Sequence, residues 1–139
     1  MENCVFCKIV NKEIPCYKIY EDELTLAFLD INPIIAGHVL IVPKKHFENI
    51  FDIEEDYLKA IIEASKKISL KIKETLKIEG INLYQANGPI AGQTIFHFHL
   101  HLLPRTEGDG IDFIKWMGKM AKKMKAQEME EIRNKLAIN

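Results

Sequence analysis

The order of apolar and polar residues along the chain predicts one sheet. Short runs rich in β-branched and aromatic residues, bounded by Pro, Gly or acidic turns, are typical of strands. Most of the connections between these runs are too short for a parallel crossover, so we expect an α+β fold with a five-stranded antiparallel sheet. The runs lie at residues 16–22, 24–30, 38–43, 81–86 and 94–104.

Two other segments follow a helical period. From Glu54 to about Leu76, apolar residues recur at spacings of three, four and seven, which predicts an amphipathic helix. A methionine-rich pattern from about Asp112 to Leu136 predicts a second main helix, whose methionines we assign to packing. The stretch CVFCKIVNK near the N-terminus fits either a short helix or a metal-binding knuckle.

Length and charge narrow the class of protein. A chain of 139 residues predicts one domain, and a net charge of −1 gives no reason to expect nucleic acid or a membrane as partner. No signal-peptide pattern is present, and no apolar run approaches the ~20 residues that span a bilayer. We therefore expect a soluble, cytoplasmic protein. The three cysteines do not suggest a disulfide framework.

The stretch HFHLHLL carries the candidate chemistry. On a strand, His97, His99 and His101 would share one face, and Phe96, Phe98, Leu100 and Leu102 the other. Three imidazoles could bind a metal, or they could perform nucleophilic and acid–base chemistry on phosphorus. The glycine-rich loop at residues 88–94 could present N–H groups to an anion.

The pair Cys4 and Cys7 is compatible with several structures. A Cys-x-x-Cys motif can be half of a zinc site, a redox pair, or two buried small residues. No thioredoxin-like βαβ pattern follows it, which disfavours the redox pair. Cys16 receives no role and is expected to be buried.

The HFHLHLL motif resembles the signature of the histidine triad (HIT) family. The stretches VFCKIVNKEIP, EDELTLAFLDINP, GHVLIVPKKH and AGQTIFHFHLHLLPR follow in the family's order. The resemblance implies a single HIT domain over residues 1–139, with a core at 4–105 and a helical tail at 106–139. It also implies a homodimer whose two sheets join into one of ten strands.

The resemblance further implies a nucleotide phosphoramidase or nucleotidyl hydrolase that attacks the α-phosphate of purine nucleotides. His99 would be the nucleophile and would form a covalent nucleotidyl-histidine. The implied catalytic residues are His99, His101, His38, Gln93 and Thr94. The implied nucleotide-binding residues are Phe6, Ile9, Phe28, Asp30, Ile31, Asn87, Gln93, Thr94, His99 and His101.

Two details of this resemblance concern individual positions. Some relatives bind structural zinc through a Cys-x-x-Cys, a distant histidine and the first triad histidine, which implies a zinc site here. Its ligands would be Cys4, Cys7, His46 and His97. Close relatives also carry Asn or Gln where this chain has Ala86, so Gln85 or Asn87 would have to replace that polar group.

Three other functions are compatible with the same residues. AGQT and HLLPR also resemble the fragile-histidine-triad branch, which would make the chain a dinucleoside polyphosphate hydrolase. It could alternatively be a regulatory module that binds purine nucleotides, or a zinc-binding scaffold.

Overall fold

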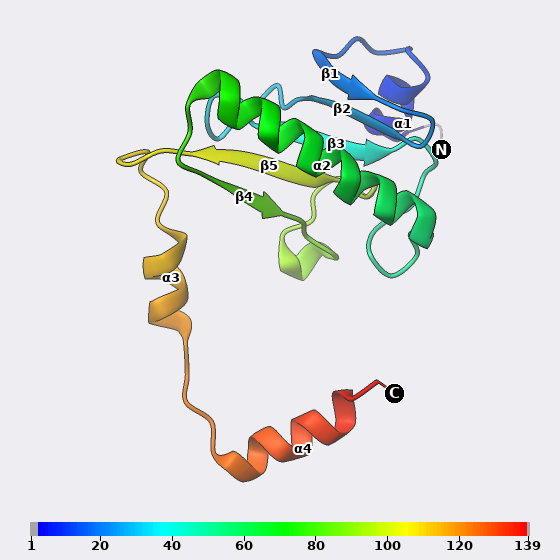
Figure 1. Ribbon diagram of the computed structural model, residues 1–139. Helices are drawn as coiled ribbons and strands as arrows, with labels where there is room; N and C mark the ends of the chain where they lie inside the picture. Colours follow the sequence, from blue (N-terminus) through cyan, green and yellow to red (C-terminus); the bar gives the residue numbers. More distant parts are fainter. Residues whose placement is uncertain (1–2, 139) are drawn as a thin grey trace. The chain divides into compact units, whose positions relative to one another are not determined.

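Five strands form one antiparallel sheet, in the order β1-β2-β3-β5-β4 (Figure 1). The computed structural model describes residues 3–138, which divide after Asp109 into two compact units. The sheet lies in the first unit and confirms the predicted α+β class. Its strands are β1 Lys18–Glu21, β2 Thr25–Leu29, β3 Val39–Pro43, β4 Gly80–Tyr84 and β5 Leu100–Arg105.

The central strand β3 is buried on both faces. Val39 and Ile41 belong to one apolar cluster, whereas Leu40 and Val42 belong to the other. This division follows from the alternation of side chains along a strand. A continuous apolar run is therefore needed at β3, and the sequence VLIVP supplies it.

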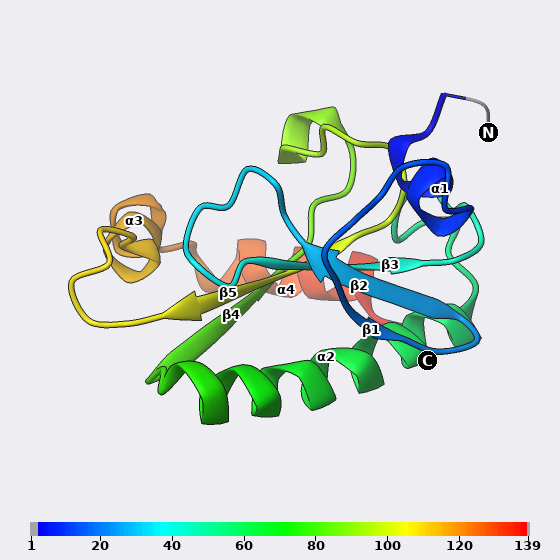
Figure 2. The ribbon, with the colours of Figure 1, turned by 90° about the horizontal axis from the view of Figure 1, so that it is seen from above.

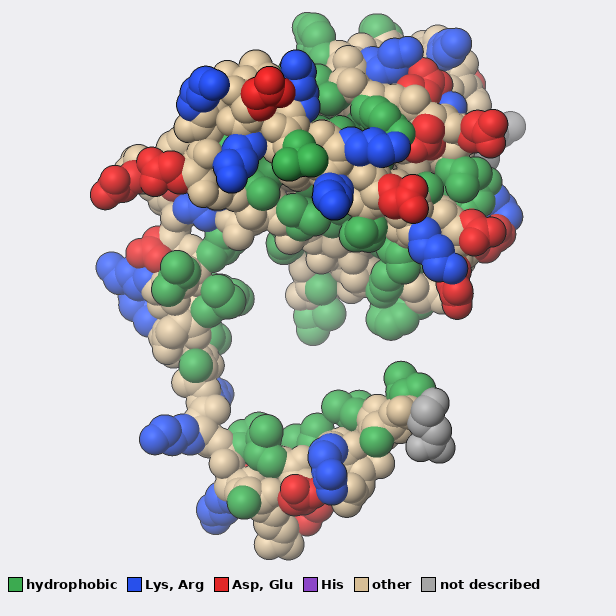
Figure 3. All heavy atoms as spheres, in the orientation of Figure 1, with side chains coloured by type: hydrophobic (Ala, Val, Ile, Leu, Met, Phe, Trp, Pro, Cys, Tyr) green, Lys and Arg blue, Asp and Glu red, His purple; other side chains and the backbone are tan. Residues whose placement is uncertain are grey.

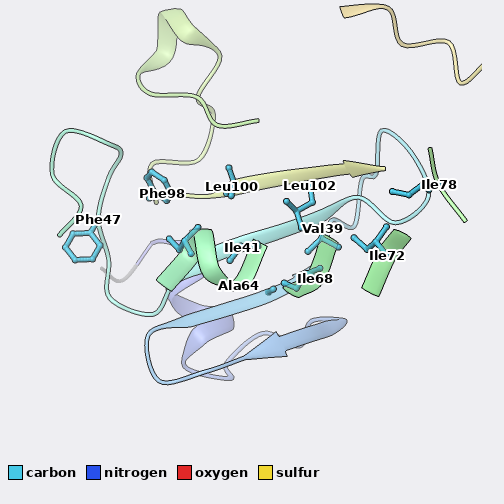
Figure 4. Close-up of a cluster of buried hydrophobic side chains, with 12 residues drawn as sticks. Val39, Ile41, Phe47, Ala64, Ile68, Ile72, Ile78, Phe98, Leu100 and Leu102 are labelled. Atoms are coloured by element: carbon cyan, nitrogen blue, oxygen red, sulfur yellow. The ribbon is translucent and has the colours of Figure 1, made fainter. Parts of the chain in front are cut away.

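Helix α2, Glu55–Leu76, covers one face of the sheet (Figure 2). Its buried side chains include Ile61, Ala64, Ile68 and Ile72, whose spacings of three and four place them on one side of the helix. They pack with residues of β3 and β5 in the cluster that Figure 4 shows. The helix predicted from Glu54 to Leu76 is thus confirmed.

Helix α1, Val5–Val10, lies on the opposite face of the sheet (Figure 2). Phe6 is buried there with Leu26, Phe28 and Leu40. Cys4 caps the helix, and its Sγ accepts a hydrogen bond from the Cys7 N–H at 3.4 Å. Of the two structures that the N-terminal stretch allowed, the short helix is present.

The last predicted strand is shorter than expected. It was predicted over residues 94–104, but β5 begins only at Leu100. Before that residue the backbone bonds elsewhere, since the Phe98 N–H donates to the Phe47 carbonyl at 2.7 Å. Phe96 was expected on the core face with Phe98, yet it is 42% exposed because it lies outside the strand.

The second unit contains two helices where one was predicted. They are α3, Phe113–Met120, and α4, Ala126–Leu136, and the backbone is extended at Ala121 between them. Neither Pro nor Gly occurs within residues 121–125, so the sequence gives no signal for this break. Hydrophobic side chains lie on the surface of both helices (Figure 3). Among residues 3–138, no helix is long and apolar enough to cross a membrane.

Candidate active site

Three neighbouring strands bring the polar side chains together. Asp30 follows β2, His38 precedes β3, and His101 lies within β5 opposite Leu40. His38 Nε2 is 2.8 Å from His101 Nδ1 and 3.7 Å from Asp30 Oδ2. The ring of His99 lies beside that of His101, with 4.8 Å between their centroids. The site is therefore built from strand ends, where the sheet fixes each backbone position.

Asp30, His99 and His101 border a pocket of about 260 Å³. The apolar rings Phe6 and Phe28 meet edge to face in its wall, with centroids 5.7 Å apart. Asp30, His99 and His101 supply polar groups. Of the residues expected to bind nucleotide, the pocket is lined by Phe6, Ile9, Phe28, Asp30, Ile31, Thr94, His99 and His101.

One hydrogen bond fixes the tautomer of His99. Its Nδ1 lies 2.8 Å from the His97 carbonyl oxygen. A carbonyl can only accept, so Nδ1 carries the hydrogen and Nε2 keeps a free lone pair. The residue is 8% exposed, and Phe6 packs edge to face on its ring at 5.2 Å. His99 thus has one nitrogen held by the backbone and the other available for reaction.

A chain of hydrogen bonds fixes His38 and His101 in the same way. The Ile34 N–H donates to His38 Nδ1 at 3.2 Å, so the hydrogen of neutral His38 is on Nε2. That N–H donates to His101 Nδ1, which leaves the hydrogen of neutral His101 on Nε2. Asp30, His38 and His101 lie close enough together to hold a metal ion. However, His38 Nε2 and His101 Nδ1, which a metal would need, are hydrogen-bonded to each other.

Burial keeps these imidazoles neutral near pH 7. Together with the neighbouring rings of His99 and His38, it lowers the pKa of His101 to about 4. Burial also lowers the pKa of His99 and of His38. The hydrogen bond to the His97 carbonyl partly opposes the shift of the His99 pKa, and the Asp30 carboxylate partly opposes both shifts. A neutral ring is the form in which an imidazole nitrogen can act as a nucleophile.

The side chain of Gln93 forms hydrogen bonds with the backbone of the glycine-rich loop and of its neighbours. Its side chain is 4% exposed, and its Oε1 accepts the Gly88 N–H at 2.7 Å. Its Nε2 donates to the carbonyls of Glu48, at 2.6 Å, and Ile95, at 3.1 Å. Gln93 is absent from the described lining of the pocket. It joins the loop to residue 48.

Asn87 is also engaged away from the pocket. Its side-chain oxygen accepts the Ile50 N–H at 2.7 Å. The side-chain amides of Gln85 and Asn87 bond to each other in both directions. Neither residue is among the described residues that line the pocket.

We expect Gln93→Leu to lower the free energy of unfolding by about 2 kcal/mol. The substitution leaves the Gly88 N–H and the Glu48 carbonyl without their partner, and an unpaired buried polar group costs roughly 1–3 kcal/mol. Urea unfolding measures the change, with the exposed Gln127→Leu as control. Unchanged stability together with lost turnover would show that Gln93 serves the substrate instead.

A second cluster lies where α1 approaches the triad. Cys4 Sγ is 3.3 Å from His97 Nδ1, and Cys7 Sγ is 3.3 Å from His46 Nδ1 and 3.5 Å from His97 Nδ1. The four ligand atoms all lie within 4.8 Å of one another. The helical turn after Cys4 brings the two sulfurs together, and the segments after β3 and before β5 supply the imidazoles.

The geometry of this cluster fits a tetrahedral zinc site. Zinc bonds of ~2.3 Å to sulfur and ~2.0–2.1 Å to nitrogen place the two ligand atoms about 3.5 Å apart. His97 Nε2 lies 2.9 Å from the Pro43 carbonyl, so it carries the hydrogen and leaves Nδ1 free to coordinate. Burial lowers the pKa of His97 to about 4, which keeps the ring in its ligating form.

Residues 11–108 match the HIT domain family. The chain belongs to the HIT family. Among three relatives of this HIT chain, one is named as uncharacterized and two are named as enzymes. An uncharacterized HIT-like protein of Borreliella burgdorferi is 47% identical over 115 residues, covering 81% of this chain and 83% of that protein. An adenosine 5′-monophosphoramidase of Candida albicans is 40% identical and covers 95% of each chain. An adenylylsulfatase of Arabidopsis thaliana is 42% identical over 77% of this chain and 54% of its own length.

Solved HIT structures share the fold. A HIT family protein of Bacillus subtilis has a TM-score of 0.82 and 37% identity, covering 99% of both chains. A zinc-bound histidine triad protein of Mycobacterium smegmatis has a TM-score of 0.76 and 38% identity, covering 81% of both chains.

Sequence reasoning missed part of the pocket of this HIT domain. Leu40 could have been found, since alternation along the central strand places it on the face opposite Ile41. Cys16, which was expected to be buried, is partly exposed and lines the pocket. The lining residues that were not predicted are Val5, Ile14, Pro15, Cys16, Leu29, Asn32, Leu40 and Ile95.

Proposed function

We propose that this protein hydrolyses purine nucleotide derivatives at the α-phosphate, as a nucleotide phosphoramidase or nucleotidyl hydrolase. The observation that carries the proposal is the orientation of His99 beside a nucleoside-sized pocket. A hydrogen bond from its Nδ1 to the backbone holds the ring and leaves Nε2 free. The names of two relatives, an adenosine 5′-monophosphoramidase and an adenylylsulfatase, support adenosine 5′-phosphate derivatives as the substrate class.

The first step transfers the nucleotidyl group to His99. The Nε2 lone pair forms a bond to phosphorus, and the bond from phosphorus to the leaving group breaks with its electron pair. A leaving amine takes a proton from water. The modified ring is a cation whose Nδ1–H stays on the His97 carbonyl. The Nε2–H of His101 donates a hydrogen bond to a phosphate oxygen, where negative charge develops.

The second step returns the enzyme to its starting form. Water attacks the same phosphorus, the bond to Nε2 breaks, and the imidazole leaves as a neutral ring. The proton released by the water passes to solvent, so the two steps add one water to the substrate. In the pocket, Phe6 and Phe28 would contact the base and Asp30 would accept hydrogen bonds from the ribose hydroxyls.

Zinc bound by Cys4, Cys7, His46 and His97 has a structural role in this proposal. All four protein ligands are present, which is typical of a closed structural site rather than a catalytic one. The metal would hold α1 against the segment before β5. A homodimer, in which β4, one of the two outer strands, offers an edge of the sheet, is also part of the proposal.

A comparison of leaving groups tests the reaction. Purified protein is given adenosine 5′-phosphoramidate and, separately, diadenosine triphosphate, and released AMP is measured. We expect a kcat/KM at least tenfold higher for the phosphoramidate. A reversed preference would identify a dinucleoside polyphosphate hydrolase, and binding of AMP without turnover of either compound would identify a nucleotide-binding module.

A further inference from the structure

A second hollow adjoins the pocket that contains His99. Its volume is about 660 Å³, compared with about 260 Å³ for the pocket. The two share Val5, Thr94 and Ile95 as lining residues, so they are neighbours across that wall. The described lining of the hollow is Asn3, Cys4, Val5, His46, Glu48, Thr94, Ile95 and Phe96.

The size of the pocket leaves room for only part of a substrate. Sites for whole small molecules usually measure ~300–1,000 Å³, which is more than the pocket offers. In an in-line displacement, the leaving group departs on the side of phosphorus opposite the nucleophile. His99 and His101 line the pocket but are not among the described residues that line the hollow. The hollow is therefore available to a group that points away from His99.

Glu48 carries the formal charge in the described lining of the hollow. Among its described lining residues, Glu48 is the only formally charged one. The lysines just before it are engaged elsewhere, since Lys44 pairs with Glu21 and Lys45 with Glu54. Two thiolates would neutralise a zinc ion in the adjacent cluster, so the metal would add no net formal charge.

Two hydrogen bonds hold the backbone of Glu48 in place. Its carbonyl accepts the Gln93 side-chain amide at 2.6 Å, and its N–H donates to Asp52 Oδ2 at 2.9 Å. The carboxylate of Asp52 adds a second negative charge to this segment. The side chain of Glu48 itself is exposed, so its charge can face a group that enters from solvent.

We propose that this hollow is the leaving-group subsite and that Glu48 selects cationic amine leaving groups over anionic ones. This inference rests on the proposed function, whose substrate class it narrows. It predicts that leaving groups with a terminal ammonium are favoured, neutral amines are intermediate, and carboxylate-bearing amines are disfavoured. A charge at several ångströms in a water-exposed site changes the free energy modestly, so we expect roughly three- to tenfold steps.

Three adenosine 5′-phosphoramidates of similar length test the subsite. Their amines are 1,4-diaminobutane, n-butylamine and 4-aminobutanoate, which differ in the charge at the far end. For the wild-type protein, kcat/KM should fall in that order. In Glu48→Gln the differences should shrink to less than twofold, and in Glu48→Lys the order should reverse. Glu63→Gln, an exposed residue of α2, is the matched control and should keep the wild-type order.

The outcomes separate this inference from the function on which it rests. If all three compounds release AMP and the Glu48 variants keep the wild-type ratios, the hollow is not the leaving-group subsite and the phosphoramidase remains. If the wild-type protein releases AMP from none of the three but does so from adenosine 5′-phosphoramidate, this inference alone is wrong; release of AMP from none of the four compounds contradicts the phosphoramidase as well. Added salt should compress the wild-type ratios, and a salt-independent preference would also contradict the role of Glu48.

Discussion

His99→Ala is expected to reduce AMP release from adenosine 5′-phosphoramidate on the order of 10³-fold or more, with AMP still bound within about tenfold of the wild-type affinity. The substitution removes the nitrogen that attacks phosphorus, and the loss of a nucleophile usually has an effect of this size or greater. The aromatic wall and Asp30 remain, so binding persists. Steady-state kinetics and calorimetric titration with AMP measure the two quantities.

A second variant separates nucleophilic loss from structural damage. In His99→Asn, the side-chain amide can still donate to the His97 carbonyl, as Nδ1 does now, but it offers no nucleophilic nitrogen. It should be as inactive as His99→Ala. Rapid acid-free quenching of the wild-type protein should capture a phosphorus–nitrogen adduct that both variants lack. Turnover in either variant near the wild-type rate would exclude His99 as the nucleophile.

Cys4→Ser is expected to lower the zinc content from one ion per chain to a small fraction and to lower Tm by roughly 10 °C or more. A closed structural site contributes several kcal/mol to folding, and a domain of this size loses about 4 °C per kcal/mol. The serine hydroxyl can still accept the Cys7 N–H as the cap of α1, so the change reports the loss of the metal ligand. Metal analysis of protein purified without chelator and thermal unfolding measure the two changes.

Cys16→Ser provides the matched control, since Cys16 lies outside the cluster of four ligands. It should keep its zinc and should unfold within a few degrees of the wild-type protein. Wild-type protein that contains no zinc would contradict the metal assignment. A Cys4→Ser variant that retains a full complement of zinc would show that the ion binds elsewhere.

The sequence predicted the sheet and helix α2 because their patterns are long and regular. At β3, four apolar residues between Gly37 and Pro43 leave little alternative to a buried strand. In α2, six turns of consistent spacing outweigh any single residue. The members of the candidate site were identified by the spacing of the histidines and by resemblance, and the structure brings His38, His99 and His101 together.

Other features depend on contacts that no local pattern encodes. The backbone before Leu100 leaves the sheet because Phe98 bonds to Phe47, some 50 residues earlier in the chain. The bonds of Gln93 also depend on a distant segment. Its polar side chain looks suited to a phosphate, but its amide donates a hydrogen bond to the carbonyl of Glu48. The break in the tail, at residues 121–125, contains no Pro or Gly, and the residues around it pack too little for periodicity to decide their conformation.

The two roles proposed for the triad, metal binding and catalysis, meet at a single residue. His97 contributes its ring to the metal cluster and its carbonyl oxygen to His99. If the cluster holds zinc as proposed, removing the metal should let the peptide group of residue 97 move, and the imidazole of His99 would lose the acceptor that holds its orientation. A chelator would then slow turnover even though no metal touches the substrate, and the inhibition would imitate that of a metallohydrolase.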